Sequence, residues 1–321
     1  MIKRFLIIIC LAVLSIQTVH GGESEFPLFK VGAGGRAAAM GGAYTGVAND
    51  ASAVFWNPAG LAQIDKTISL MFTNRMHFQS MKLLEFFGTY SDIKFGTFGI
   101  GILSNQVDDI NAYDSQMNFL GTFGSYERMF IISYAYNLTP VYIGFSLASV
   151  QEGMDPYQGD LSGNGISINV GLMTRISNNF KIGSTIRPGF SVKYDDNKDN
   201  IPGQTSLGAE FTMGMELVSP DDSLRLVVDL NQSNRLPLKT NFGIELGFMN
   251  AIYIRGGINS LMIESRTDDL ELSDYMSANM KYCFGAGLRF SVLDGSIFHL
   301  DFGLTSANMG SSTAITLSWI K

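Results

Sequence analysis

Few residue combinations in this sequence could support catalysis. His299 lies two residues from Asp301, so on a strand the two side chains would share a face and could form a polar pair. A hydrolase of the serine type would also need a positioned serine. A half match to the Gly-x-Ser-x-Gly turn occurs at Gly144–Ala148, but it lies in a predicted strand. We therefore predict that the chain is not an enzyme and has no catalytic residues.

Two short runs are similar to ligand-binding loops without completing them. Asp195–Asn200 is similar to the start of a calcium loop, but the turn glycine is missing and the twelfth position is Ser206. Gly32–Ala38 is rich in glycine like a dinucleotide-binding loop, but no preceding strand or βαβ unit accompanies it. After the first 22 residues Cys283 is the only cysteine, which excludes an intramolecular disulfide and a cysteine-based metal site. The sequence predicts no cofactor and no bound metal.

The first residues have the pattern of a secretory signal peptide. Lys3 and Arg4 precede an apolar run over residues 5–14, and small and polar residues follow up to Gly22. An N-terminal membrane anchor is the alternative, but about ten apolar residues are too few to cross ~30 Å of hydrocarbon. No later apolar run is long enough for a transmembrane helix. We therefore predict a signal peptide over residues 1–22 and an exported chain.

From about Thr67 onward, segments of roughly ten residues alternate apolar residues with small or polar ones. In 224–230, for example, every second residue is Leu or Val, and Arg225 and Asp229 occupy the opposite face. A period of two is that of a β-strand, and this length matches a tilted strand that spans a bilayer. About fourteen such segments lie near residues 66–76, 83–92, 94–104, 128–138, 140–150, 165–176, 179–187, 206–218, 222–230, 239–249, 252–259, 282–290, 296–306 and 312–320.

The connections between these segments sort by length. After odd-numbered segments they are mostly long, near residues 105–127, 151–164, 188–205 and 260–281, and after even-numbered segments they are short. Outer-membrane barrels have short periplasmic turns and long external loops. A soluble sheet with one wet and one buried face would alternate in the same way, but it has no reason to sort its loops. We therefore predict an all-β fold, a transmembrane antiparallel β-barrel of about 14 strands over residues 66–321, in the outer membrane of a diderm bacterium.

Charged residues make up only 16% of the chain, below the roughly 25% usual for soluble proteins. On a lipid-facing surface Arg or Lys would cost about 2–4 kcal/mol at the midplane, so charges within strands should point into the lumen while outer-membrane lipid surrounds the barrel. The net charge of −7 without a basic stripe argues against nucleic acid as a partner. The residues expected to face the lumen include Arg175, Lys181, Arg187, Glu210, Arg225, Asp229, Glu245, Arg255, Arg289 and Asp301.

Residues 23–65 break the alternating pattern and are rich in small residues. Asp50 is expected to cap a short helix over residues 51–55, and Asn57 to cap a turn that begins at Pro58. Irregular backbone is acceptable inside a barrel lumen because it is not exposed to lipid. We predict that this segment is an N-terminal plug containing short helices. Glycines expected to permit tight bends are Gly41, Gly42 and Gly60.

The runs Gly35–Ala51 and Phe55–Ala62 together closely resemble the opening of the PorV/PorQ family, a branch of the FadL-type outer-membrane transporters. In FadL-type proteins an Asn-Pro-Ala motif lies in the N-terminal hatch that plugs a fourteen-stranded barrel, and Asn57-Pro58-Ala59 matches this motif. The resemblance implies that the motif sets the fold of a gating plug. The residues assigned to this gate are Asp50, Asn57, Pro58, Ala59 and Gly60.

The same resemblance implies a function. Hydrophobic small molecules would be captured or moved across the outer membrane, with the plug as gate and with Phe55, Trp56 and Leu61 along the ligand path. The alternative is a non-enzymatic component of type IX protein secretion that binds cargo or translocon proteins. The sequence contains no substrate-specific motif that separates these two functions.

Overall fold

The computed structural model describes residues 27–65, 67–77, 81–154, 161–195, 204–233, 238–262, 280–307 and 310–321. The predicted signal peptide, residues 1–22, lies outside these residues, as do residues 196–200 of the acidic run.

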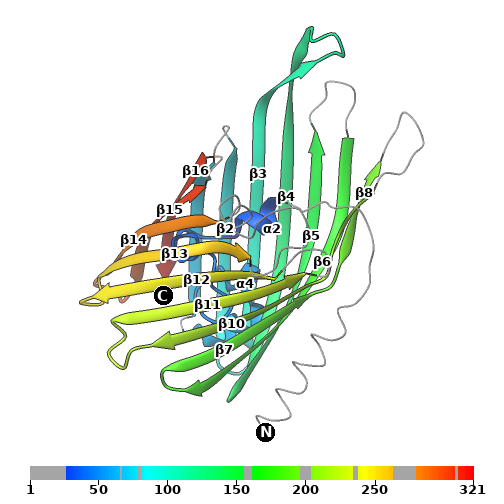
Figure 1. The fold of residues 1–321 in the computed structure, drawn as a ribbon. Coiled ribbons are helices and arrows are strands. Elements are labelled where there is room, and N and C mark those ends of the chain that lie inside the picture. The colour runs from blue at the N-terminus through cyan, green and yellow to red at the C-terminus, as the bar shows by residue number, and fades with distance from the viewer. Residues whose placement is uncertain are drawn as a thin grey trace.

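Fourteen antiparallel strands close into a barrel, which confirms the predicted fold class (Figure 1). The first and last strands complete the ring, pairing from Ser69 with Ile320 to Met76 with Thr313, so that it has no free edge. The strands of the ring are β1 (Ile68–Met76), β2 (Lys82–Asp92), β3 (Gly96–Tyr113), β4 (Phe119–Leu138), β5 (Val141–Met154), β6 (Leu161–Ser177), β7 (Phe180–Arg187), β10 (Glu210–Val218), β11 (Leu224–Ser233), β12 (Lys239–Phe248), β13 (Ile252–Met262), β14 (Lys281–Ser291), β15 (Ile297–Ala307) and β16 (Gly310–Ile320).

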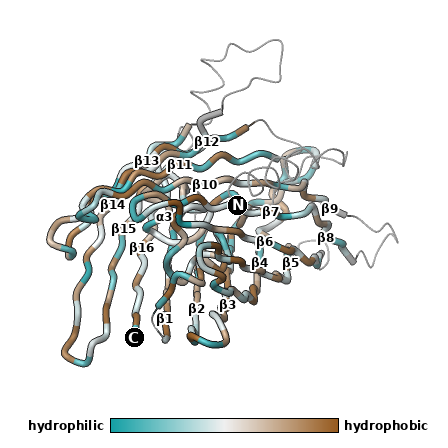
Figure 2. Tube along the Cα trace, turned by 90° about the horizontal axis from the view of Figure 1, so that it is seen from below, coloured by the Kyte–Doolittle hydropathy of each residue, from teal (hydrophilic) through white to brown (hydrophobic). Residues whose placement is uncertain are grey.

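The two faces of the barrel wall differ as the alternation predicts, and the change from apolar to polar along each strand is visible in Figure 2. On β1, Leu70 and Phe72 point outward and are 38% and 48% exposed, while Thr73 and Arg75 point inward and are buried. A continuous apolar outer surface is what a barrel in hydrocarbon needs. Of the charged residues expected in the lumen, Arg175 differs, because it lies exposed near the end of β6. No helix in the described ranges is long and apolar enough to cross a membrane.

The predicted loop over residues 105–127 is wrong for most of its length. β3 and β4 continue as one hairpin to Tyr113 and Phe119 and rise above the neighbouring strands (Figure 1). Their pairing shifts register near Asp109, whose φ is 58°. The extension lies beyond the apolar outer surface, where both of its faces carry polar residues, so the two-residue alternation that marks the other strands is weak there.

The hairpin formed by β7 and β10 also continues, as β8 (Phe190–Asp195) and β9 (Gln204–Leu207). The register is unchanged across the break, since Arg187 pairs with Glu210 before it and Phe190 pairs with Leu207 after it. Pro188 opposes Ala209 and Gly189 opposes Gly208 at the break. Proline cannot donate to a ladder and glycine tolerates a bend, so both strands are interrupted at one level.

The break at Pro188 and Gly189 also interrupts the hydrogen-bonded ladder between β6 and the strand formed by β7 and β8. β6 pairs with β7 from Val170 onward and with β8 up to Asn164. Among the described residues, the stretch 165–169 has no strand partner on that side, although its pairing with β5 is continuous.

The N-terminal segment lies inside the ring, as Figure 1 shows for α2 and α4. Its elements are α2 (Pro27–Val31), α3 (Gly35–Ala39), α4 (Ala53–Trp56) and the 3₁₀ helix η1 (Pro58–Gln63). We call residues 27–65 the plug. Its small residues permit close approach, because a Cβ at Gly60 would overlap the backbone of Ala48. Gly41 and Gly42 have φ of 68° and 72°, so the predicted bend is present at these two residues.

The helix expected over residues 51–55 begins two residues later, at Ala53. Asp50 is drawn into a turn instead, where its Oδ1 accepts from the backbone N–H of Ser52 at 2.9 Å and from the Ser52 hydroxyl at 2.5 Å. Its Oδ2 accepts from the Tyr44 hydroxyl. These three hydrogen bonds hold Asp50 outside the helix that it is expected to cap.

The turn between β10 and β11 gives a pH-dependence prediction. The hydroxyls of Ser219 and Ser223 donate to Asp221 Oδ1 at 2.5 and 2.9 Å and lower the pKa of this carboxyl to about 2. A depressed carboxyl pKa adds stability above its unfolded pKa, about 4, that is lost as pH falls through about 2. We therefore expect Asp221→Asn to lower the midpoint of unfolding at pH 6 and to lower it much less at pH 2. An equal loss at both pH values would contradict this assignment.

Candidate functional site

One side of the plug is bound to the barrel wall by buried charges. Glu245 on β12 accepts two hydrogen bonds from Arg36 of α3, each 2.8 Å long. Arg255 on β13 donates to the same carboxylate at 2.7 Å, and Arg225 on β11 also reaches it. Hydrogen bonds between ionised groups are stronger than neutral ones, and paired bonds from one arginine fix its orientation. Glu245 is therefore the shared anion that ties the plug to two arginines of the wall.

The charges continue along the wall on both sides of Glu245. Glu216 lies 2.7 Å from Arg225 and 2.6 Å from Lys181, in ion-pair contacts rather than aligned hydrogen bonds. Arg255 reaches Asp301 at 2.7 Å. Asp301 is thus bonded to an arginine and not to His299, its partner in the pair suggested by the sequence. These contacts make the wall from β7 to β15 a connected ionic surface behind the plug.

Two further wall carboxylates bind the plug backbone. Asp229 Oδ2 accepts from the backbone N–H groups of Tyr44 and Thr45 at 3.0 and 2.9 Å. Glu85 Oε2 accepts from the backbone N–H of Gly34 at 2.6 Å. Backbone amides that are buried need partners, and here the wall supplies them in place of plug secondary structure.

The predicted motif Asn57-Pro58-Ala59 is the start of η1. It lies on the side of the plug that faces β6. The Asn57 side chain accepts from Ala59 N–H at 3.1 Å, and its Nδ2 donates to the carbonyls of Thr45 at 2.9 Å and Leu172 at 3.4 Å. Pro58 occupies the first position of the 3₁₀ helix. An amide side chain supplies both the acceptor that caps the helix and the donors that join plug to wall.

Asn57→Asp tests this dual role. The carboxylate keeps the acceptor for Ala59 but loses both donors and places negative charge beside two carbonyl oxygens. An unsatisfied buried group costs about 1–3 kcal/mol, so we expect the plug to loosen by that amount. Hydrogen exchange of the amides in residues 43–63 measures it, with Gln63→Glu as a control at a less buried amide. Unchanged protection in Asn57→Asp would contradict the dual role.

The other residues predicted for the gate and the ligand path do not form one site. Some pack within the plug, and Phe55 faces the barrel wall. Gly60 contacts Ala48 within the plug, and Leu61 is fully buried. Trp56 donates from Nε1 to the Ala33 carbonyl at 2.9 Å. Of the three residues assigned to the ligand path, Phe55 lines a cavity between plug and wall, and Trp56 and Leu61 do not line this cavity.

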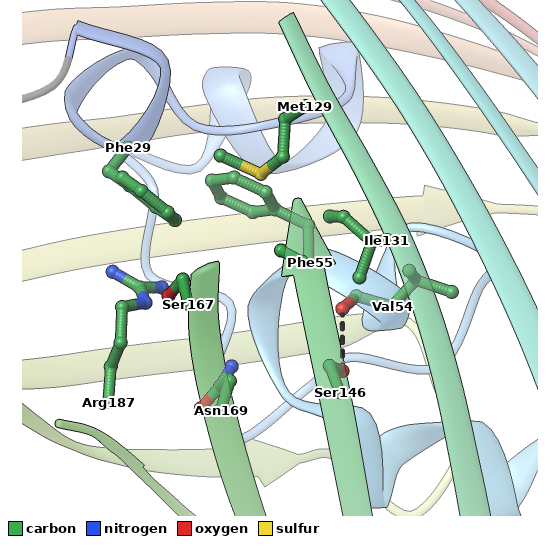
Figure 3. Close-up of a pocket in the computed structure, with 10 residues that line it drawn as sticks. Phe29, Val54, Phe55, Met129, Ile131, Ser146, Ser167, Asn169 and Arg187 are labelled. Carbon is green, nitrogen blue, oxygen red and sulfur yellow. Dashed lines mark hydrogen bonds between the residues drawn. The ribbon is translucent and has the colours of Figure 1, made fainter. Parts of the chain in front are cut away.

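This small cavity lies between the plug and strands β4 to β7, and Figure 3 shows the side chains that line it. Its volume is about 20 Å³, which is room for about one water molecule and too little for a hydrocarbon. The lining residues are Phe29, Val54, Phe55, Met129, Ile131, Ser146, Ala148, Ser167, Asn169 and Arg187.

Most of this lining is apolar, and its polar members are partly unsatisfied. Ser146 donates to the Val54 carbonyl of the plug at 3.1 Å and contacts the Ser133 hydroxyl at 2.7 Å. Asn169 Oδ1 is buried and has no hydrogen-bond partner among the described residues. Ser146 belongs to the run that half matches a nucleophile turn, and it serves here as a contact between wall and plug.

The cavity lies directly behind the interrupted ladder. Ser167 and Asn169 belong to the unpaired stretch of β6, and Arg187 is the last residue of β7. The ring of Phe29 lies 4.1 Å from the Arg187 guanidinium and 5.9 Å from the Phe190 ring. Phe29 of α2 thus packs against both sides of the break in the wall. No sequence signal marks Phe29 or Arg187 as site residues, because their contact depends on the register of distant strands.

In the described part of the chain, no group of three or more His, Cys, Asp and Glu side chains is placed to hold a metal ion.

The fold is similar to that of solved hydrocarbon transporters. The Pseudomonas putida toluene transporter TodX matches with a TM-score of 0.62 at 12% identity, covering 90% of this chain and 98% of TodX. The Ralstonia pickettii toluene transporter TbuX matches with a TM-score of 0.61 at 12% identity, covering 90% and 97%. A Pseudomonas aeruginosa FadL homologue matches with a TM-score of 0.56 at 11% identity, covering 88% and 96%.

At these identities the likeness establishes the FadL-type fold and not the activity. No curated protein matches the sequence. A family model described as Uncharacterised protein family (UPF0164) matches residues 12–184, more than half of the chain, and the chain belongs to this family.

Proposed function

We propose that this protein moves hydrophobic small molecules across the outer membrane, with the plug as its gate. The observation that carries the proposal is the position of the cavity. It lies between the aromatic residues of the plug and the one side of the wall where the described part of the β6 ladder is interrupted. An apolar molecule in the cavity would contact its apolar side chains. It would also lie next to the stretch of β6 that is unpaired on one side.

The two sides of the plug suggest how such a gate moves. The side facing β11 to β13 is held by the shared carboxylate of Glu245. The side facing β4 to β6 is held by apolar contacts of Phe29 and Phe55 and by two hydrogen bonds between uncharged groups, from Ser146 to the Val54 carbonyl and from Asn57 to the Leu172 carbonyl. Apolar contacts are non-directional, so this side can slide while the ionic side stays anchored. Displacement of α2 and α4 would enlarge the cavity toward the break.

Several narrower assignments belong to the same proposal. The fold resembles outer-membrane transporters, which supports location in the outer membrane after export by a signal peptide over residues 1–22. The domain limits are then a plug segment at 23–65 and a barrel at 66–321 in contact with lipid. The resemblance of the runs Gly35–Ala51 and Phe55–Ala62 supports membership of the PorV/PorQ branch, and we propose no enzymatic activity.

Uptake by cells tests the proposal. The full chain is expressed in a diderm host that lacks its own FadL-type transporters, and uptake of radiolabelled toluene and of a long-chain fatty acid is measured. We expect the chain to accelerate uptake of at least one probe. Uptake of both probes equal to that of cells with an empty vector, although folded barrel is present in the outer membrane, would refute the proposal.

The secretion alternative rests on the PorV/PorQ resemblance alone. Its test is recovery of translocon or cargo proteins after mild crosslinking in cells that possess type IX secretion. Absence of such partners would leave transport as the surviving function.

A further inference from the structure

A row of acidic and amide side chains crosses three strands of the lumen at one level. Asn105 of β3 stands directly opposite Glu127 of β4, and Glu127 stands directly opposite Glu152 of β5. Asn105 and Glu127 are buried, at 5% and 8% exposure, and Glu152 is half-buried with a carboxylate oxygen out of contact with solvent. Opposed residues of antiparallel strands have Cβ atoms about 4.5–5.5 Å apart.

Two carboxylates facing each other in this way repel, and like charges directly opposite destabilise a sheet. The other buried glutamates of the wall contact cations: Glu85 meets Arg75 and Glu216 meets Lys181. Among the described residues, neither Glu127 nor Glu152 has an ion pair. The pair is therefore left without the compensation that the rest of the lumen provides.

The hydrogen bonds around the pair leave acceptors unused. Asn105 Nδ2 donates to Glu127 Oε2 at 3.2 Å. Asn105 Oδ1 and Glu152 Oε1 are buried and have no hydrogen-bond partner within the part of the chain that the structure describes. Rotation of the Asn105 amide about its Cβ–Cγ bond exchanges Nδ2 and Oδ1, and this turns the oxygen toward the Glu127 carboxylate in place of the donated hydrogen bond. Three neighbouring strands thus present oxygen atoms that need a positive partner.

We propose that Asn105, Glu127 and Glu152 form a binding site for a divalent cation of the calcium type. Calcium takes six to eight oxygen ligands from carboxylates, amide carbonyls and water in flexible geometry. Magnesium demands near-ideal octahedral geometry, which a row of side chains along three strands does not supply. Two carboxylates and one amide oxygen bind the ion, and water completes the coordination.

The site also lies next to the plug. Glu127 precedes Met129 by two residues on the inner face of β4, and Met129 lines the cavity together with Phe29 of α2. A bound cation would orient Glu127 beside this cavity. This consequence rests on the proposed gating function, whereas the binding site itself does not.

Cation binding by the full-length protein in detergent tests the site directly. After treatment with EDTA, calcium is titrated by calorimetry, and terbium luminescence provides a second readout. We expect saturable binding that weakens at least about tenfold in Glu152→Gln and tightens in Asn105→Asp, because affinity follows the charge of the ligands. Glu210→Gln is the matched control, since it removes a lumenal carboxylate that is paired with Arg187 at 3.0 Å.

Each outcome decides the proposal. Unchanged affinity in Glu152→Gln would place bound calcium elsewhere and overturn the site. Absence of calcium and terbium binding in the wild-type protein would also overturn it and would indicate that the carboxylates share a proton. Migration before and after boiling confirms that each variant is a folded barrel. Because no step measures uptake, failure here is distinguishable from failure of the transport function.

Discussion

Replacing Glu245 by glutamine is expected to release the anchored side of the plug and to destabilise the protein strongly. The carboxylate is the shared partner of Arg36, Arg225 and Arg255. Arg255 and Glu245 have side chains only 1% and 2% exposed, so water cannot replace the lost charge. Removing one partner of a buried ion pair costs about 3–5 kcal/mol because it leaves an uncompensated charge.

Two measurements separate the effects of Glu245→Gln. Unfolding in detergent reports the loss of stability, and limited proteolysis reports whether residues 27–65 become accessible while the barrel stays closed. Glu210→Gln is again the control, because the side chains of Arg187 and Glu210 are 15% and 31% exposed and partly exposed pairs contribute about 1 kcal/mol or less. Equal stability of the two variants would show that Glu245 does not anchor the plug.

The second large effect is expected one residue earlier, on the opposite face of the same strand. Ile244 lies in the middle of β12, points outward and is 39% exposed. Its register partner Leu226 also points outward and is 41% exposed. Arginine on the lipid face costs about 2–4 kcal/mol at the midplane, so Ile244→Arg should impair insertion and lower the stability of the inserted barrel.

Ile244→Leu is the matched control because it keeps an apolar side chain of the same volume. The fraction of chain that folds into lipid vesicles and its unfolding midpoint are compared for both variants. If Ile244→Arg inserted as well as Ile244→Leu, the assigned outer face would be wrong. Glu245→Gln should leave insertion intact, so the neighbouring substitutions are expected to fail in different assays.

The sequence predicts the wall well because the alternation of a half-exposed strand is a local property. The segment predicted at 239–249 is observed as Lys239–Phe248, and the one predicted at 179–187 as Phe180–Arg187. Local chemistry also predicts the cap at Asn57, because a short polar side chain before proline is sufficient to start a helix. The sequence does not predict the β3–β4 extension. A hairpin with solvent on both sides needs no apolar face, so the alternation of apolar and polar residues that identifies the other strands is weak there.

The structure of the plug and the position of its cavity are harder to predict from the sequence. α3 is five residues long, mostly of small side chains, and contacts with the wall such as the hydrogen bond from Gly35 N–H to Thr316 hold it. A helix this short is not stable on propensity alone. The contact of Phe29 with Arg187 and Phe190 joins residues separated by more than 150 positions, so only the closed register brings them together.

The central claim is that movement of the plug admits apolar molecules, and a reversible lock tests it most directly. A Cβ at Gly101 would lie 3.1 Å from a methyl carbon of Val54 in α4, so Val54→Cys with Gly101→Cys brings two thiols within reach of a disulfide. Toluene uptake is measured in oxidised and reduced cells, with the wild-type chain as control. The gate predicts that oxidation stops uptake in the double variant and that reduction restores it. Equal uptake with the crosslink formed would contradict a moving plug.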